Sequence, residues 1–328
     1  MSQNFKSIIV NEKNGKINID IKKRSIDKLP HGELLIKVEY SSLNYKDALS
    51  ASGVKGVTKK YPHTPGIDAA GVVIKSISNN FPIGTRVIVT GFDLGMNTSG
   101  GFSEYIRVPS QWAIKCPSTL TTKRAMMIGT AGLTAGLSVN AMTKTINLED
   151  SEVIISGATG GVGSIGVNLL SKLGANVTAI TSKIKKEKSL LDLGASKVID
   201  KNIFLESTKL PLNKGIHNAA LDVVGGNILT SIIASMKYGG VIATTGNACS
   251  PIFETTVFPF ILRANSLIGI DSANCSIEMR RKIWKNFASK WKLKFPHAMQ
   301  KTVNLENMIP EIRKILKGQQ VGRVLLEL

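Results

Sequence analysis

The residues that could do chemistry most directly are those able to hold a phosphate. Residues 153–166 read V-I-I-S-G-A-T-G-G-V-G-S-I-G, and five of these fourteen residues are glycine. A glycine-rich turn between a strand and a helix lets backbone N–H groups and the positive end of the helix approach a phosphate. The literal spacing G-x-G-x-x-G starts at Gly161, and the looser spacing A-x-G-x-x-G starts at Ala158.

Geometry favours the earlier of these two spacings. A phosphate-binding turn must stand directly between the end of the strand and the start of the helix. If the strand ends at Ser156, the earlier spacing meets this condition, and Gly166 is better explained as a residue that lets the helix pack close to the sheet. Turns of this kind also occur without nucleotides. We expect dinucleotide contacts from Ala158, Thr159, Gly160, Gly161, Val162 and Gly163.

The next predicted strand helps to choose the dinucleotide. NAD sites usually carry Asp or Glu about 20 residues after the glycines, where the carboxylate binds the ribose 2′-hydroxyl. Here the strand ends in Thr181, Ser182 and Lys183, and the first acidic residue after it is Glu187. A hydroxyl and an ammonium suit a 2′-phosphate, so Ser182 and Lys183 favour NADPH over NADH. The alternative is that these lysines form the solvated first turn of a helix.

The elements that must position these residues follow two different patterns. Up to about residue 120 short apolar strands alternate with turn signals, which predicts a mostly antiparallel domain. From about Thr121 strands alternate with helices, which is typical of a doubly wound parallel sheet. The expected strands of the first part are 7–10, 34–39, 70–74 and 86–89. In the second part we expect strands at 152–156, 176–181, 197–199, 216–222, 241–245 and 267–270, and helices at 162–173, 185–193 and 228–236.

Composition sets outer limits on the function. A chain of 328 residues is long for one hydrophobic core, and its 43% hydrophobic and 20% charged residues are ordinary for a folded protein. Three scattered cysteines and four histidines show no ligand spacing, so we expect no metal site. The N-terminus lacks the apolar core of a signal peptide and no later segment suggests a membrane span, so we expect a cytoplasmic protein without a membrane partner.

The charge is strongly positive, with 42 Lys and Arg against 23 Asp and Glu, a net +19. Such a balance is compatible with nucleic acid, an anionic membrane or a polyphosphate ligand, and equally with a lysine-rich proteome. Basic runs interleaved with aromatic residues are absent, so we expect no nucleic-acid partner.

Five stretches besides the glycine turn give the chain a family resemblance. The chain resembles the zinc-independent members of the medium-chain dehydrogenase/reductase superfamily, close to the acrylyl-CoA reductases and quinone-oxidoreductase-like relatives. The resemblance runs from about residue 7 to Arg323. The stretches are S-S-L-N-Y-K-D-A-L at 41–49, P-G-I-D at 65–68, I-G-T-A-G at 128–132, F-P-F-I-L-R at 258–263 and G-I-D-S at 269–272.

The resemblance implies an α/β fold with a Rossmann domain, a doubly wound parallel sheet, and a β-rich GroES-like catalytic domain. It implies the catalytic domain at 1–120, the Rossmann domain at 121–262, and a last segment, 263–328, that ends the Rossmann sheet and returns to the catalytic domain. Zinc enzymes of the superfamily have a cysteine where Asn44-Tyr45 stands, and G-H-E where Gly66-Ile67-Asp68 stands. We therefore expect a reaction without metal.

The reaction implied by the resemblance is NADPH-dependent reduction of the activated C=C bond of a short enoyl-CoA thioester, most like acrylyl-CoA to propionyl-CoA. The alternatives are an NADPH:quinone oxidoreductase and a non-catalytic NADPH-binding protein. The reductase needs a hydrogen-bond donor for the developing oxyanion and a proton source. Tyr45 is the candidate donor, Asn44 is expected to contact the nicotinamide ribose or the substrate, and Asp47 to fix the loop or pair with a basic residue.

Further cofactor contacts are carried over from the resemblance. Arg323 is expected to reach a phosphate or the carboxamide, and Thr130 to lie near the nicotinamide phosphate. The resemblance also implies a homodimer, with the strand at 267–270 as the edge through which two copies pair. The remaining expected contacts are Val223, Val224, Thr245, Gly246, Ile270 and Ser272.

Overall fold

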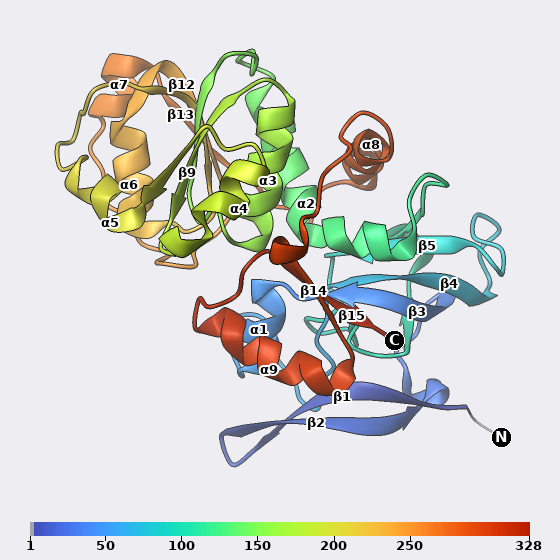
Figure 1. The fold of residues 1–328 in the computed structure, drawn as a ribbon. Coiled ribbons are helices and arrows are strands. Elements are labelled where there is room, and N and C mark those ends of the chain that lie inside the picture. The colour runs from blue at the N-terminus through green and yellow to red at the C-terminus, as the bar shows by residue number, and fades with distance from the viewer. Residues whose placement is uncertain (1–2) are drawn as a thin grey trace. The chain divides into compact units, whose positions relative to one another are not determined.

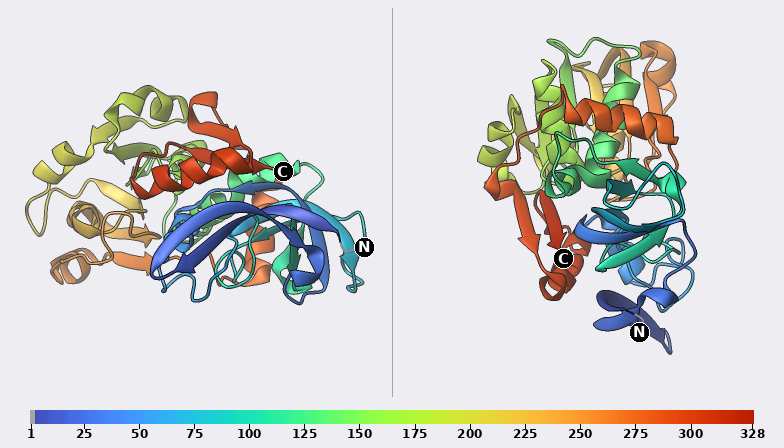
Figure 2. Two further views of the ribbon diagram at one scale, coloured as in Figure 1. Left: turned by 90° about the horizontal axis from the view of Figure 1, so that it is seen from below. Right: turned by 90° about the vertical axis from the view of Figure 1, so that its right-hand side faces the viewer.

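The computed structural model describes residues 3–328, which fold into two compact units (Figure 1). We call residues 131–272 and 290–299 the second unit, and the remaining described residues, up to 130, 273–289 and 300–328, the first unit. The chain thus leaves the first unit and returns to it twice. Figure 2 follows the same chain from two further sides.

The second unit contains a six-stranded sheet in which every pair of neighbouring strands is parallel. The strand order is β10-β9-β8-β11-β12-β13. From β8 the chain adds β9 and β10 on one side of the sheet, and it then adds β11, β12 and β13 on the other side. The strand order therefore reverses between β8 and β11, which is the position where doubly wound sheets bind ligands. The strands are β8 (Glu152–Ile155), β9 (Asn176–Thr181), β10 (Lys197–Asp200), β11 (His217–Asp222), β12 (Met236–Thr244) and β13 (Ser266–Gly269).

Helices pack on both faces of this sheet because its strands are apolar on both sides. Gly166 of α3 lies against Leu221, so α3 covers the face to which Leu221 points. Alternate residues such as Ile154 and Ala220 point to the other face, where they pack with Phe204 of α5 and with α6. The helices of this unit are α3 (Gly161–Lys172), α4 (Glu187–Asp192), α5 (Lys201–Glu206), α6 (Gly226–Ala234) and α7 (Phe258–Arg263).

The first unit is built on a seven-stranded sheet of order β14-β15-β3-β4-β5-β7, with β6 paired to β3, and a separate β1–β2 hairpin. All of its strand pairs are antiparallel except β14 with β15. The strands are β1 (Asn4–Lys13), β2 (Lys16–Ser25), β3 (Leu34–Ser42), β4 (Asp68–Ser76), β5 (Arg86–Thr90), β6 (Tyr105–Val108), β7 (Ala113–Lys115), β14 (Gln300–Val303) and β15 (Arg323–Glu327).

Helices α1 (Tyr45–Ala51) and α9 (Leu305–Leu316) share one core of the first unit with β15. Buried Ala48 of α1, Met308 of α9 and Val324 of β15 belong to this core. Tyr45 is the first residue of α1, so this core fixes the backbone that carries it. The unit also contains α8 (Ile277–Ala288), whose Arg280 and Trp284 are buried.

Helix α2 (Thr122–Met142) is broken at Gly129, whose φ of 52° and ψ of −158° are not helical. The boundary between the units falls just after this break, at 130/131 rather than at the expected 120/121. The boundary lies there because residues of α2 before the break form hydrogen bonds with side chains of the first unit. Among residues 3–328, α2 alone is long and apolar enough for a membrane span, and 83% of its apolar window is buried inside the protein, as in a core helix.

Candidate functional site

The turn between β8 and α3 has the geometry that the earlier glycine spacing predicts. The strand ends at Ile155 and the helix starts at Gly161, with Gly160 in extended backbone as its N-cap. A Cβ on Gly163 would lie 2.3 Å from the carbonyl oxygen of Gly157, so only glycine fits there. A Cβ on Gly166 would lie 2.5 Å from Leu221, which confirms its role in packing the helix against the sheet.

This turn suits a phosphate because some of its backbone N–H groups hold the turn in place and others are open to a ligand. The N–H of Ala158 donates to the carbonyl oxygen of Ile180 at 3.0 Å, and Ala158 is fully buried. Gly161, Val162 and Gly163 are the first residues of α3, where N–H groups have no partner within the helix. The residues therefore fit a dinucleotide diphosphate, with Ala158 as part of the frame and the helix start as the donor.

A buried carboxylate connects the ends of three neighbouring strands at this edge. The side chain of Asp222 accepts hydrogen bonds from Ser156 Oγ at 2.7 Å and from Thr244 Oγ1 at 3.1 Å. Ser156 follows β8, whereas the other two residues end β11 and β12. Burial raises the pKa of Asp222, and its hydrogen bonds oppose that shift. The network holds the loops after these strands in one arrangement.

The predicted cofactor residues of the second unit gather at the same edge. Val223 and Val224 directly follow β11 and are half-buried. Thr245 donates its N–H to the carbonyl oxygen of Asp222 at 2.8 Å, and Gly246 is exposed beside it. After β13, Ile270 donates its N–H to the carbonyl oxygen of Thr244 at 3.0 Å, and Ser272 accepts a hydrogen bond from Thr134 at 2.8 Å.

The loop after β9 presents Ser182 and Lys183. Ser182 is exposed and Lys183 is half-buried. Burial lowers the pKa of Lys183, and within residues 3–328 its ammonium makes no hydrogen bond or ion pair. A partly desolvated cation without a partner gains most from an anionic ligand. This observation favours an anion at Lys183, whereas the exposed Lys185 lies in the short 3-10 helix Ile184–Lys186 that follows, as the alternative expected.

In the first unit, the loop before α1 is held by Asp47. Its carboxylate accepts the backbone N–H of Asn44 at 2.8 Å, of Ile67 at 2.7 Å and of Gly66 at 3.1 Å. Asp47 is fully buried, and burial together with the nearby charge of Asp68 raises its pKa to about 7. Of the two roles expected for Asp47, the structure supports fixing the loop, because its contacts are to backbone groups.

Asp68 is the centre of a second buried network. Its carboxylate accepts hydrogen bonds from Ser42 Oγ at 2.6 Å and from Asn44 Nδ2 at 2.8 Å. The N–H of Thr130 at 2.9 Å and its hydroxyl at 2.6 Å donate to the same carboxylate. Both of these donors of Thr130 are therefore engaged with Asp68. The expected contact of Thr130 with the nicotinamide phosphate stays a prediction.

Arg323 differs from its expected role. It is 2% exposed, and its guanidinium lies 3.8 Å from the carboxylate of Asp68. Its five N–H groups face five acceptors inside the first unit, so none is left to reach a phosphate or a carboxamide. These acceptors are the carbonyl oxygens of Met127 at 3.0 Å, Met126 at 3.3 Å and Leu43 at 3.4 Å, Ser42 Oγ at 2.8 Å and Asn44 Oδ1 at 3.3 Å.

Asp68 and Arg323 supply hydrogen-bond partners for the backbone groups of α2 that are left open at its break. Where the helix stops, Arg323 donates to carbonyl oxygens that have lost their helical partners. Where the helix resumes, Asp68 accepts the N–H of Thr130, and a negative group is favourable at a helix start. A Cβ on Gly129 would lie 2.5 Å from Asp68 Oδ2, so this network also requires the glycine.

Tyr45 is the predicted catalytic residue that these networks leave available. Asn44 is 9% exposed, and its side-chain amide serves Asp68, Arg323 and the carbonyl oxygen of Ser42. Tyr45 follows directly and is half-buried, and within residues 3–328 its hydroxyl has no hydrogen-bond partner. The loop therefore holds a rigidly mounted phenol whose hydroxyl can donate to a substrate.

Sequence reasoning assigned no role to Asp68 beyond its replacement of a zinc ligand, and none to Ser42. Both stand within stretches that carry the family resemblance, so the motif marked the position but not its partner. The partner, Arg323, lies far along the chain, where no local spacing points to it.

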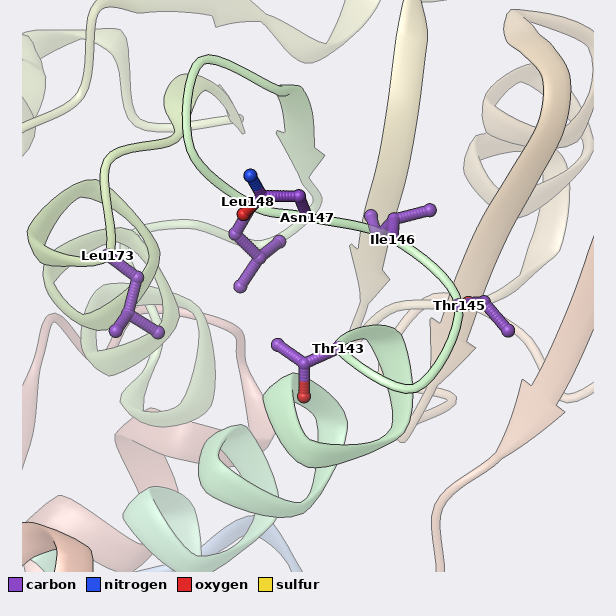
Figure 3. A pocket seen from close by; sticks show the side chains of 6 residues that line it. All are labelled: Thr143, Thr145, Ile146, Asn147, Leu148 and Leu173. Carbon is purple, nitrogen blue, oxygen red and sulfur yellow. The ribbon is translucent and has the colours of Figure 1, made fainter.

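Among residues 3–328 no group of three or more His, Cys, Asp or Glu side chains could hold a metal ion. A hollow in the second unit is lined by six side chains without a charged group, five of them in the segment between the end of α2 and β8 and one at the end of α3 (Figure 3). These are Thr143, Thr145, Ile146, Asn147, Leu148 and Leu173.

Two family models match the chain. The alcohol dehydrogenase GroES-like domain matches residues 30–118, and the zinc-binding dehydrogenase domain matches residues 161–289. The acrylyl-CoA reductase AcuI of Ruegeria pomeroyi is 36% identical, over 98% of this chain and 99% of that protein. A Bacillus subtilis protein named "Putative quinone oxidoreductase YhfP" is 37% identical over the whole length of both.

Solved structures agree with these relatives. The crystal structure of Escherichia coli K-12 YhdH with bound NADPH is 36% identical, with a TM-score of 0.93 over 98% of this chain and 99% of that one. The structure of Bacillus subtilis YhfP with bound NAD is 37% identical, with a TM-score of 0.95 over all of both chains. The chain is thus an oxidoreductase of the medium-chain dehydrogenase/reductase superfamily, in the family of the acrylyl-CoA reductases and quinone-oxidoreductase-like proteins.

Proposed function

We propose that this protein reduces the activated C=C bond of a short enoyl-CoA thioester with NADPH, as acrylyl-CoA reductases do. The observation that carries the proposal is the hydroxyl of half-buried Tyr45, left without a partner within residues 3–328 by a loop in which the side chains of Ser42, Asn44 and Asp47 are engaged. It occurs in a chain 36% identical to an acrylyl-CoA reductase over nearly its full length.

The second unit supplies the residues that would hold NADPH. The start of α3 would bind the diphosphate, and Lys183 with Ser182 would bind the 2′-phosphate of the adenosine ribose. Bound NADPH would supply the hydride that goes to the β-carbon of the enoyl thioester. The Asp222 network would keep the loops after β8, β11 and β12 in place around the dinucleotide.

The first unit supplies the acid. When hydride reaches the β-carbon, negative charge develops on the thioester oxygen, and a donated hydrogen bond stabilises it. Tyr45 can donate that hydrogen bond, and its O–H can supply the proton that the α-carbon needs, after which water returns a proton to the phenolate. Asn44 and Asp47 act as positioning residues, because their side chains are occupied in holding the loop.

One experiment tests this proposal. The rate of NADPH oxidation is followed at the nicotinamide absorbance band with acrylyl-CoA and with a simple quinone, and NADH serves as the control. We expect turnover with acrylyl-CoA and NADPH. Absence of turnover with acrylyl-CoA would refute the proposal.

The quinone reductase is the second candidate, because a relative with 37% identity carries that name. A quinone has no phosphates, so the two candidates differ in their need for a cationic surface. Turnover with the quinone alone would select this candidate.

We also propose a homodimer that pairs through β13. This strand ends the order of its sheet, so one of its edges has no neighbour among the described residues 3–328. Exposed apolar side chains of α7 lie in the segment just before it: Phe258 at 46%, Ile261 at 68% and Leu262 at 58%. Sedimentation should give a dimer for the wild type and a monomer for Ile261→Glu. A cytoplasmic location stays a prediction that cell fractionation can test.

A further inference from the structure

Two buried threonine hydroxyls connect the glycine turn with the loop that carries Lys183. Thr159 lies in the turn and Thr181 ends β9, and each is 2% exposed. Their hydroxyl oxygens are 3.1 Å apart. The Oγ1 of Thr181 also accepts the backbone N–H of Lys183 at 3.0 Å. One side chain therefore contacts both the turn expected to hold the diphosphate and the residue expected to hold the 2′-phosphate.

The chemistry of a hydroxyl makes Thr181 suited to this connection. A hydroxyl has one proton to donate and two lone pairs that accept. Thr181 can accept the N–H of Lys183 while it shares its remaining capacity with Thr159. Valine has nearly the same shape but can do neither, whereas serine can do both.

Further contacts make the connection rigid. The backbone of the turn is tied to the same strand, since the N–H of Ala158 donates to the carbonyl oxygen of Ile180 at 3.0 Å. The carbonyl oxygen of Lys183 accepts the N–H of Lys186 at 2.8 Å. The backbone of Lys183 is thus fixed at its N–H and at its carbonyl group, and its ammonium is the part that can adjust to a ligand.

We propose that Thr181 is a specificity-determining residue that acts through Lys183 and favours a dinucleotide with a phosphate on its adenosine ribose. The proposal rests on the proposed use of NADPH. Thr181 fixes Lys183 at a set position relative to the diphosphate turn. A dinucleotide without the 2′-phosphate gains nothing from that position, so the effect of Thr181 falls on NADPH alone.

The test measures dissociation constants of NADPH and NADH by fluorescence titration of the purified full chain, without any substrate. We expect Thr181→Val to weaken NADPH binding about tenfold, the order expected of one hydrogen bond, and to change NADH binding less than about twofold. Thr181→Ser should keep the wild-type preference. Thr178→Val is the matched control, because Thr178 is a buried threonine of the same strand that makes no contact with Lys183.

A double-mutant cycle shows whether Thr181 acts through Lys183. In a Lys183→Met chain, Thr181→Val should have no further effect on NADPH binding. An additional tenfold loss in that background would overturn the proposal, and so would an equal loss for NADPH and NADH in the single variant. If Thr181→Val does not fold, Thr181→Ala makes the same comparison with less bulk.

Failure of the proposed function can be distinguished from failure of the proposal for Thr181. A wild-type chain that does not bind NADPH would refute the proposed cofactor before any variant is compared. A chain that binds NADPH with the expected preference but reduces no enoyl thioester would leave the role of Thr181 supported while the proposed substrate fails.

Discussion

The turn after β8 and the loop before α1 use their polar groups in opposite ways. In the turn, the N–H groups at the start of α3 and the ammonium of Lys183 are left without partners among residues 3–328. In the loop, Asn44 and Asp47 are committed to internal hydrogen bonds, and the hydroxyl of Tyr45 is left. A site that binds a large anion needs many open donors, whereas a site that transfers one proton needs a single group held in place.

The largest effect should come from removing that single group. Tyr45→Phe should lower kcat with the enoyl thioester by about 10²- to 10⁴-fold, the usual contribution of a general acid, without changing the dissociation constant of NADPH. Tyr61→Phe is the control, because the Tyr61 hydroxyl already donates to the carbonyl oxygen of Ser50 at 2.7 Å. A loss of kcat below threefold in Tyr45→Phe would remove the tyrosine from the chemistry.

The next largest effect should come from removing Arg323, whose contacts hold the loop before α1. Arg323→Met leaves Asp68 buried without its cation and leaves two helix carbonyls without a donor. Such a change costs about 3–5 kcal/mol in the free energy of unfolding, measured by urea denaturation. Arg281→Met, at an exposed position of α8, should cost less than about 0.5 kcal/mol. Similar costs for the two variants would contradict a structural role for Arg323.

In the turn, crowding should weaken both the fold and ligand binding. Gly163→Ala places a Cβ against the carbonyl oxygen of Gly157, and overpacking of this kind costs about 1–3 kcal/mol. We expect NADPH to bind roughly tenfold to a hundredfold more weakly in a titration. Gly56→Ala, where a Cβ would meet nothing within 4 Å, is the control. Unchanged binding in Gly163→Ala would show that the dinucleotide does not use this turn.

The smallest effect concerns pH. The pKa of Asp47 is about 7 in the folded protein against an ordinary 3.8, so the folded state binds its proton more tightly than the unfolded state does. Its contribution to stability is full below pH 3.8 and is lost as the pH rises through about 7. Asp47→Asn should be less stable overall but lack this decline, as seen in melting temperatures across that range. The same decline in both proteins would assign it to another group.

The turn could be predicted from the sequence because everything that defines it is local. The spacing of Ala158, Gly160 and Gly163, the strand at 176–181 and the packing role of Gly166 all depend on residues close together in the chain. The spacing of the glycines in the sequence marks the positions where a side chain would clash with the backbone. The structure places the turn, the start of α3 and the strand β9 where the earlier spacing requires them, and the ligand contacts of the turn stay a prediction.

The loop could be predicted only in part. The motif pointed to Tyr45, but Arg323 was assigned to the cofactor, because an arginine in a family motif gives no sign of being buried. Its partners lie in three separate stretches, 42–44, 68 and 126–127, and only tertiary structure brings them together. Helix α2 was not among the expected helices, and its break at Gly129 depends on the same distant partners. Helices α8 and α9 and strands β14 and β15 were left undivided in one returning segment.

The half-buried ammonium of Lys183 also has a consequence for reactivity. Because burial lowers its pKa, a larger share of this amine is uncharged and nucleophilic at a given pH than for a fully solvated lysine. An amine-acylating reagent used sparingly at mild pH should therefore modify Lys183 ahead of the many solvated lysines, and a bound dinucleotide should shield it. Covalent labelling followed by peptide mass analysis would then report occupancy of the site without a substrate.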